Sequence, residues 1–399
     1  MNRYAVLVLT ASSMFLVIMA ILVDSPPLFF MSAALIATLL ASRLQAYLAV
    51  RGLRFERFSP EAVRVGEEVT MEIVVWSQRK LKRPLVNVVD HLPKQLVTKD
   101  RKHSLPVAPS FDQPIRTRYS FKPMRRGRFR WSHLTVHGTD ALGLITQQND
   151  YQTEPVNLTV YPAPIPVSVD LQPSPGWGVS DLETATIKGP GIEPRGIREY
   201  AEGDPERYVH WASSARAGKL MVKEFDTGSG VSLCFVLQNS QGSEVGDEDA
   251  STLEAMCGHL LYLSNDFLSA GAMVQFPQFE DRHAPTDHSE ARIREIRDLL
   301  TEVEADGTRS LTQVLEDKRA ETDGTTLVVA MAEQDADLPG YLASHPRTQR
   351  TVLIYDAREY AKDRRLPDGY RAAAEPGYLS ELEAAGAHVI LMPTVEKIG

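Results

Sequence analysis

The sequence contains few cysteines and few aromatic residues. Two of its 399 residues are cysteine, and aromatic residues make up 8%. An extracellular domain of this size more often carries a disulfide framework, so two cysteines agree better with a chain that faces the cytoplasm. We expect Cys234, in a predicted core strand, and Cys257, in a predicted helix, to be buried free thiols. With 43% hydrophobic and 24% charged residues, the composition excludes a mostly disordered chain, a collagen and a polytopic transporter.

Charge is missing from the first apolar run, residues 4–23, which is 20 residues long. At 1.5 Å per residue this run can cross a hydrocarbon core of about 30 Å. A second apolar run at 28–50 contains one charged residue, Arg43. Its side chain would snorkel to the interface, or the helix would have to tilt. We therefore expect residues 1–53 to form a transmembrane hairpin with spans at about 4–23 and 28–50. The alternatives are a buried core hairpin and a cleaved secretory signal, for which Pro26-Pro27 is a poor cleavage site.

The distribution of charge predicts the orientation of this hairpin. Residues 51–130 contain 19 Lys or Arg against 8 Asp or Glu, a net charge of +11, whereas residues 131–399 contain 22 against 43, a net charge of −21. The loop between the spans carries only Asp24, and the cations lie outside it, at Arg3, Arg43, Arg51, Arg54 and Arg57. Positive residues favour the cytoplasmic side. We expect a multi-pass protein of the cell (inner) membrane with both termini in the cytoplasm.

Short alternating apolar runs, such as those at 69–76, 128–136 and 156–161, predict a β-sandwich at residues 54–165. Its excess of cations, including Arg125, Arg126, Arg128 and Arg130, could contact anionic membrane lipid or form the solvated face of a strand. The alternation with Phe129 and Trp131 favours the solvated face. Nucleic acid is not an expected partner, because stacking aromatics would have to point outward with the cations.

Residues 166–230 form a proline-rich linker and a distinctive charged segment, and residues 231–399 alternate between strands and helices. This alternation predicts a doubly wound α/β domain with a mostly parallel, buried sheet. We expect strands at 231–237, 272–276, 326–331, 351–355 and 388–392, and helices at 250–270, 289–303, 311–315 and 379–385. In the helix expected at 289–303, one face carries Ile293, Ile296, Leu299 and Leu300.

The segment from Gly189 to Asp226 mixes six cations with seven acids. Asp204-Pro205 predicts a helix start and Gly218 a helix end, so we expect a helix at 205–217. The charges could form a structural ion-pair network or an arginine cluster that binds a carboxylate or phosphate. A hydrolase would pair His210 with Ser214, but an orienting acid and an oxyanion hole are not evident. The glycines match neither a dinucleotide fingerprint nor a P-loop.

This segment resembles the signature of the domain-of-unknown-function-58 family. The matching residues, which are also our candidates for partner binding, are Arg198, Glu199, Tyr200, Gly203, Asp204, Arg207, His210, Trp211, Ser214, Arg216, Lys219 and Lys223. The resemblance implies a membrane-associated bacterial protein whose α/β part is similar to a von Willebrand factor type A domain. It also implies a MoxR-type AAA+ ATPase as a partner, since the genes of the two commonly lie side by side.

Type A domains can hold Mg²⁺ at the carboxyl end of the sheet, and the resemblance gives the equivalent positions here as Gln238, Ser240, Gly242, Thr308 and Glu333. Magnesium needs hard oxygen ligands, usually with a carboxylate among them, and Gln238 and Gly242 depart from that pattern. We therefore expect a degenerate site with no metal, no cofactor and no catalytic residue. The leading hypothesis is a non-enzymatic, membrane-anchored adaptor that binds a MoxR-type ATPase, and the alternative is a membrane-bound hydrolase using His210 and neighbouring polar residues.

Overall fold

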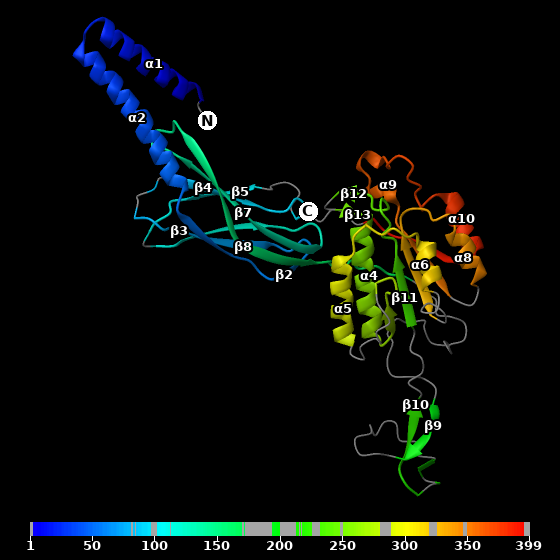
Figure 1. Cartoon of the computed structure of the whole chain (residues 1–399). Helices are drawn as coiled ribbons and strands as arrows, with labels where there is room; N and C mark the ends of the chain where they lie inside the picture. Colours follow the sequence, from blue (N-terminus) through cyan, green and yellow to red (C-terminus); the bar gives the residue numbers. More distant parts are fainter. Residues whose placement is uncertain are drawn as a thin grey trace. The chain divides into compact units, whose positions relative to one another are not determined.

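The computed structural model describes residues 3–80, 83, 85–96, 102–111, 113–169, 171, 194–199, 213, 214, 216, 218–225, 232–247, 250–279, 289–318, 325–345 and 349–394. The chain forms two compact units, one ending at Tyr161 and the other beginning at Pro162 (Figure 1). Each unit has its own hydrophobic core.

The first unit begins with two apolar helices, α1 (Arg3–Leu22) and α2 (Pro26–Val50). The two expected helices are therefore confirmed. Each is long and apolar enough to cross a membrane, with a mean hydropathy of 2.6 for Tyr4–Leu22 and 1.7 for Pro26–Val50. They form an antiparallel pair because the chain reverses within three residues, at Val23, Asp24 and Ser25 (Figure 1). Proline at the first positions of α2 suits a helix start, where its missing amide donor has no partner to lose.

The last turns of α2 are buried against the strands that follow. Gly138 lies so close to α2 that an added Cβ would be 2.7 Å from Val50. The end of the helix is capped by side chains: Arg83 Nη1 donates to the carbonyls of Leu48 and Ala49 at 2.6 and 3.0 Å. The Tyr151 hydroxyl donates to the Val50 carbonyl at 2.6 Å. These bonds satisfy carbonyls that have no partner within the helix, so α2 is joined firmly to the sheets.

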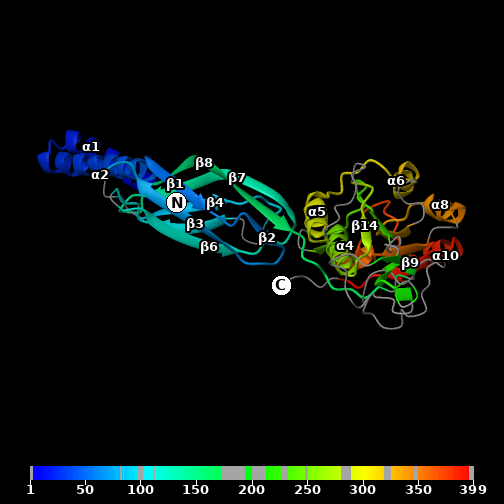
Figure 2. The same ribbon diagram turned by 90° about the horizontal axis from the view of Figure 1, so that it is seen from below.

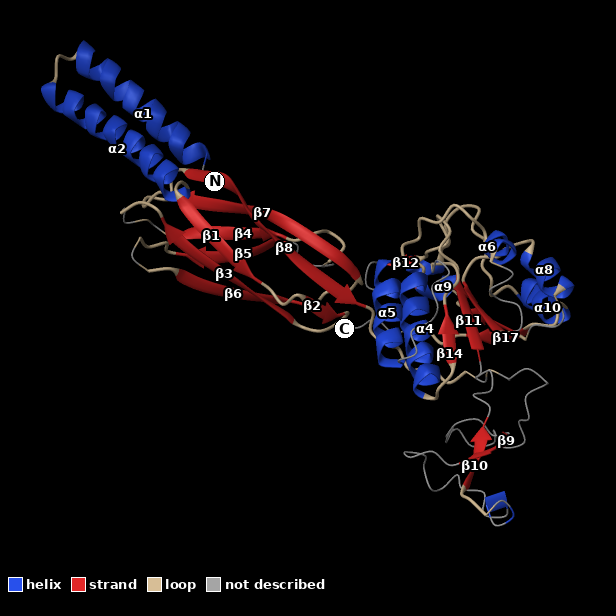
Figure 3. Cartoon of the chain, turned by 60° about the horizontal axis from the view of Figure 1, so that its bottom comes forward, coloured by secondary structure: helices blue, strands red, loops and turns tan. Residues whose placement is uncertain are grey.

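Two sheets make up the rest of this unit (Figure 3). The antiparallel three-stranded sheet has the order β1 (Leu53–Phe58), β3 (Val69–Ser77), β6 (Ile115–Phe121). The five-stranded sheet has the order β2 (Ala62–Arg64), β8 (Thr146–Tyr161), β7 (Gly127–Thr139), β4 (Val86–His91), β5 (Lys102–Val107). Alternate residues of both sheets, with Ala49 and Val50 of α2, form one buried cluster.

A buried ion pair crosses between these sheets. Arg57 on β1 donates to Asp90 on β4 at 3.1 Å, and the exposed fractions of the two side chains are 1% and 0%. The Tyr119 hydroxyl on β6 donates to the other Asp90 oxygen at 2.8 Å. Arg57 also donates to the carbonyls of Trp131 and Glu154, beside the register shift between β7 and β8. A buried charge is tolerated only when it is paired and hydrogen-bonded in this way.

The β7 and β8 strands extend well beyond the expected runs at 128–136 and 156–161. They pair from Gly127↔Val160 to Thr139↔Thr146. The added part of β8 includes the polar run Thr146-Gln147-Gln148-Asn149-Asp150, which lacks the apolar alternation that predicts a strand. Backbone pairing with β7 therefore decides the conformation of this part.

The second unit contains a sheet of five parallel strands in the order β14 (Met273–Gln275), β11 (Ser232–Leu237), β15 (Thr326–Met331), β16 (Arg350–Ile354), β17 (His388–Leu391). Among the described residues from 250 onward, this unit has the helices α4 (Thr252–Ser269), α5 (Ser289–Glu302), α6 (Leu311–Asp317), α8 (Leu338–Ser344), α9 (Ala357–Tyr360), α10 (Pro376–Ala384) and the 3-10 turn η2 (Lys362–Arg364). Two short strands, β12 (Gly246–Asp247) and β13 (Ala250–Ser251), pair before α4. The α8 and α9 helices were not expected, since each is short.

Helices cover both faces of this sheet (Figure 2). Phe235 and Val328 face α4 and α5, whereas their neighbours Val236 and Val329 face α6, α8 and α10. Both faces are buried, which explains why the strands are almost continuously apolar. The expected apolar face of α5 is confirmed, with Ile296 and Leu300 at 0% exposure. Cys234 and Cys257 are buried free thiols, also as expected.

The first residues after Tyr161 pack on α4. The Ile165 amide donates to the Gly258 carbonyl at 3.0 Å. An added Cβ at Gly258 would lie within 3 Å of both the Ile165 side chain and the Ala163 carbonyl, so glycine permits the contact. Val167, Val169 and Leu171 add partly buried side chains to the same core. The beginning of the proline-rich segment is thus part of the second unit's packing.

Candidate functional site

The carboxyl ends of β11 and β15 form the candidate site. The strand order of the parallel sheet reverses between these two strands, and in open α/β sheets ligands bind at such a point. Gln238 directly follows β11, and Glu333 lies two residues beyond β15. The Gln238 Oε1 atom accepts from the amides of Ala332 and Glu333 at 3.0 and 2.9 Å, and Nε2 donates to the Glu333 carbonyl at 3.1 Å. A single carboxamide therefore joins the two strand ends.

The loop after Gln238 is held by the segment that follows α5. The Gly307 amide donates to the Asn239 carbonyl at 2.9 Å, and the Gln241 amide donates to the Gly307 carbonyl at 2.8 Å. An isolated parallel bridge joins Ser240 to Gly307. Gln278 adds a side-chain bond of 2.6 Å to Asn239. Of the five positions named from the sequence, the structure joins Gln238 to Glu333, and it pairs Ser240, whose loop contains Gly242, with Gly307, the neighbour of Thr308.

The donors at these positions do not fit a magnesium ion. Gln238 Oε1 already accepts two amide bonds, so an ion at this oxygen would have to displace them. Gly242 offers no side chain, and its φ of +89° suits a tight loop rather than a ligand. Within the described residues, no group of three or more His, Cys, Asp and Glu side chains could hold a metal ion. The absence of metal stays a prediction for solution tests.

Burial shifts the pKa values of two side chains at this edge, Glu333 and Tyr370. Burial raises the pKa of the Glu333 carboxyl above its ordinary value. Burial, with a further contribution from Glu333, also raises the pKa of the Tyr370 phenol. The Tyr370 hydroxyl donates to the Ser243 carbonyl at 3.1 Å, which attaches the 238–243 loop to a third segment. Tyr370 was not expected here, because its neighbours in sequence give no strand or motif signal.

Acidic side chains predominate around the site. The acids carried by its loops are Glu304, Asp306, Glu333, Asp335, Asp337 and Glu375, and the cations are Arg309 and Arg371. Glu304, Asp306 and Asp337 are exposed. Arg309 pairs with Asp317 at 2.8 Å. The surface therefore complements a partner with positive charge better than one with negative charge.

The signature segment is described only in part. Arg198 and Glu199 lie on β9 (Pro194–Glu199), which pairs antiparallel with β10 (Met221–Phe225). Lys223 lies on β10 opposite Ile197. Arg216 and Lys219 are exposed. Outside the described residues lie Tyr200, Gly203, Asp204, Arg207, His210 and Trp211.

Ser214 has a structural partner. Its hydroxyl accepts from the Met221 amide at 2.8 Å, and its carbonyl accepts from the Gly218 amide at 3.0 Å. Ser213, Ser214 and Arg216 are helical, and Gly218 has a φ of +70°, as expected for the residue that ends a helix. The Ser214 hydroxyl thus connects this helix end to β10, which does not favour a role as a nucleophile.

The cations near residue 125 lie far from α2. Gly127 begins β7, and Thr139, at its other end, adjoins the strand residue Gly138 that contacts α2. At about 3.3 Å per residue, the two ends of β7 are about 40 Å apart. Arg128 and Arg130 are exposed, whereas Phe129 and Trp131 are buried, so the alternation expected of a solvated face is confirmed for these four residues. Arg126 is only 4% exposed, so the expectation that it lies on a solvated face was wrong.

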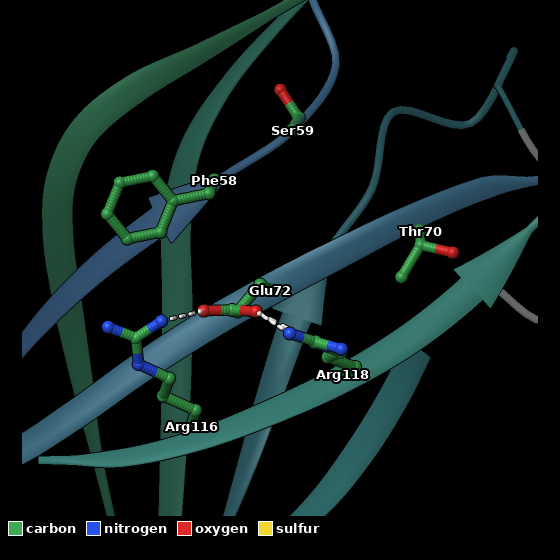
Figure 4. A pocket seen from close by; sticks show the side chains of 6 residues that line it. All are labelled: Phe58, Ser59, Thr70, Glu72, Arg116 and Arg118. Atoms are coloured by element: carbon green, nitrogen blue, oxygen red, sulfur yellow. Dashed lines mark hydrogen bonds and ion pairs between the residues drawn. The ribbon is translucent and has the colours of Figure 1, made fainter.

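A shallow pocket of about 500 Å³ lies on the outer face of the three-stranded sheet (Figure 4). Glu72 lies between two arginines and pairs with Arg116 at 3.2 Å and Arg118 at 2.7 Å. Phe58, Ser59 and Thr70 complete the lining. Because the carboxylate occupies both guanidinium groups, the pocket is not a ready site for an anion.

The fold and the site thus define a two-unit protein with two apolar helices, a two-sheet region and an α/β unit with helices on both faces of a parallel sheet. Comparison with known sequences agrees with part of the resemblance. Residues 196–361 match a family described as "Protein of unknown function DUF58". The match runs from β9 to the end of α9 and supports the family assignment. No curated protein matches the chain.

Several solved structures show limited similarity. The CARDB domain of a Pyrococcus furiosus protein is 16% identical, covers 27% of this chain and 91% of its own, and has a TM-score of 0.20. A chain in the complex of a zinc glycoprotein with prolactin-inducible protein from human seminal plasma is 17% identical, with a TM-score of 0.20. The match covers 27% of this chain and 92% of that one. A PKD domain of an M14-like peptidase from a Thermoplasmatales archaeon is 9% identical, with a TM-score of 0.16. The match covers 25% of this chain and 91% of that domain. Similarities of this size carry no argument about function.

Proposed function

We propose that this protein is a non-enzymatic, membrane-anchored interaction protein. In this proposal α1 and α2 span the cell membrane with both termini in the cytoplasm. The two-sheet region is a β-sandwich spacer, and the α/β unit is a von Willebrand factor type A-like domain that binds a protein partner at the carboxyl edge of its sheet. Arg3 and Arg51, which lie outside the apolar runs, support the orientation.

One observation carries the proposal: the Gln238 carboxamide joins the ends of β11 and β15 through both its oxygen and its nitrogen. At this position the type A resemblance places a metal-binding acid. A side chain bonded to backbone on both sides holds loops in place and is poorly suited to act on a substrate. The loops at 238–243, 304–309 and 333–337 are thereby fixed in one arrangement. A preformed surface loses little conformational entropy when a partner binds.

The charge of this edge supports a partner with a basic surface. Exposed Glu304, Asp306 and Asp337 would steer such a partner and fix its orientation. The choice of a MoxR-type AAA+ ATPase rests on the family resemblance. The acidic edge adds a condition that this ATPase should satisfy, namely a basic contact surface.

The test measures binding of the purified MoxR-type ATPase of the same organism to the full chain in lipid nanodiscs. We expect the double variant Asp306→Lys with Asp337→Lys to weaken binding by at least tenfold, since opposite charges become like charges. The control carries the same change in net charge at the other end of the domain, Glu290→Lys with Glu383→Lys. Glu290 begins α5, whose last turn leads to residue 304, and Glu383 is at the end of α10, which leads into β17.

The control variant should bind as the original chain does. Equal weakening in both double variants would mean that only net charge matters, which contradicts a site at this edge. Failure of the original chain to bind would contradict the proposed partner.

A further inference from the structure

The membrane boundary can be located along α2 from its length. From Pro26, about 20 residues at 1.5 Å per residue reach Gln45 and cover about 30 Å, the thickness of a hydrocarbon core. Because the two helices are antiparallel, Arg3 and Tyr4 at the start of α1 lie at about the same depth as Gln45. Tyr47 and Arg51 follow, with the guanidinium 4.5 Å from the centre of the Tyr47 ring. Tyrosine and arginine are typical of the membrane–water interface.

The turn between β7 and β8, residues 140–145, is attached to α2 at this level. The Ala141 amide donates to Gln45 Oε1 at 3.1 Å. Asp140 accepts from the amides of Ile145 and Leu142 at 2.7 and 3.2 Å. Burial acts to raise the pKa of the Asp140 carboxyl, but the bond from the Ile145 amide, a bond from Ser42 of α2 and the other backbone bonds together lower it. The turn is therefore held in one conformation and fixed to the helix.

The outward side of the turn is apolar. Leu142 at its tip is 62% exposed, and on α2 at the same level Leu44 and Tyr47 are 59% and 43% exposed. The sequence of the tip is Ala141-Leu142-Gly143-Leu144-Ile145, without a charge. In water these side chains would remain hydrated, whereas burial of a leucine side chain is favourable by about 1.5–3 kcal/mol. The apolar surface of α2 thus continues onto the turn.

We propose that the β7–β8 turn inserts into the headgroup–acyl boundary of the membrane beside α2, with Leu142 among the lipids. The occupant of this surface is the bilayer, because the surface is continuous with the lipid-facing side of a helix that can span it. The first unit is then attached to the membrane at two points, and its sheets have a fixed tilt. The inference rests on the membrane anchor in the proposed function, and its test separates the two.

The test uses single cysteine variants labelled with the fluorophore NBD, in full-length protein reconstituted in phosphatidylcholine–phosphatidylglycerol vesicles. Leu142→Cys reports on the turn, and Ile36→Cys, in the middle of α2, reports on the anchor. Gln148→Cys, exposed on β8 beyond the turn, is the aqueous control. The unchanged chain controls for labelling, because Cys234 and Cys257 are buried. Lipids brominated high on the acyl chain quench from the membrane, and iodide quenches from water.

We expect brominated lipid to quench NBD at positions 36 and 142 and iodide to quench it at position 148. Quenching at 142 by iodide, with lipid quenching retained at 36, would overturn the insertion of the turn and leave the anchor intact. Shielding of 142 from both quenchers would mean that protein covers the turn, which also overturns the inference. Iodide quenching at 36 would contradict the anchor and the inference together.

Discussion

Gln238 and Glu333 are joined by two hydrogen bonds in opposite directions. The Gln238 Oε1 atom accepts from the Glu333 amide at 2.9 Å, and Nε2 donates to the Glu333 carbonyl at 3.1 Å. The pair closes the ends of β11 and β15, the two strands between which the strand order reverses. A carboxamide both donates and accepts here, whereas an ionised carboxylate at this position could only accept.

The variant Gln238→Glu should therefore destabilise the α/β unit. A carboxylate cannot donate to the Glu333 carbonyl, and its charge would face that oxygen in a site where Gln238 is 6% exposed. We expect a loss of about 1–3 kcal/mol in the free energy of unfolding, measured by urea denaturation of the full chain in nanodiscs. Gln241→Glu, at an exposed position of the same loop, should change it by less than about 0.5 kcal/mol. Equal effects would contradict the role of the carboxamide.

His259 should make the stability of the α/β unit sensitive to acid. The side chain is buried in α4, where Nδ1 lies 3.2 Å from the Tyr355 hydroxyl, and burial lowers its pKa from 6.5 to about 4. Between these values the unfolded chain binds a proton that the folded chain does not, so stability falls as the pH falls through this window. The full loss would be about 3 kcal/mol.

We expect His259→Gln to remove this part of the pH dependence, measured as urea midpoints at pH 7 and pH 5. His388→Gln, at an exposed position, should retain it. The prediction is wrong if the original chain and His259→Gln lose the same stability on acidification.

Gly138→Ala should weaken the joint between α2 and β7. The added Cβ would lie 2.7 Å from Val50 Cγ1 and 3.1 Å from Ala49 Cβ, so the helix end or the strand must move. Overpacking of this kind costs about 1–3 kcal/mol, which thermal denaturation in nanodiscs would detect as a lower midpoint. Gly340→Ala is the matched control, because nothing lies within 4 Å of its added Cβ in α8. A lower midpoint in the control alone would refute the packing argument.

Magnesium should not stabilise the protein. A ligand that binds only the native state must raise the free energy of unfolding, and the carboxamide at Gln238 is already used by the backbone. We expect equal thermal midpoints in millimolar Mg²⁺ and in EDTA. A clear rise with Mg²⁺, lost on chelation, would restore a metal site to this edge.

The sequence was sufficient for the elements with strong periodicity. The uncharged run at 4–23 predicted α1, and the apolar face around Ile296 predicted α5, because burial of these side chains dominates the local choice. The polar half of β8 could not be predicted in this way. Its conformation depends on pairing with β7, an interaction that a local pattern does not contain.

The candidate site was predicted in position and not in its bonding. The type A resemblance implied that Gln238 and Glu333 lie at one edge of the sheet, and both do follow parallel strands. The bonds between Gln238 and Glu333, and the bond from Tyr370 to Ser243, depend on contacts between loops that are distant in sequence. Nor could the attachment of the 140–145 turn to α2 be anticipated, since it joins Gln45 to Ala141 across 96 positions.

We propose that the carboxyl edge of the α/β sheet receives the protein partner. Hydrogen exchange of the full chain in nanodiscs, measured with and without the MoxR-type ATPase, shows whether it does. We expect slower exchange in the presence of the ATPase at residues 238–243, 304–309 and 333–337, and no change at 290–295 on the other end of the domain. Protection confined to other regions, or no protection at any concentration of the ATPase, would contradict it.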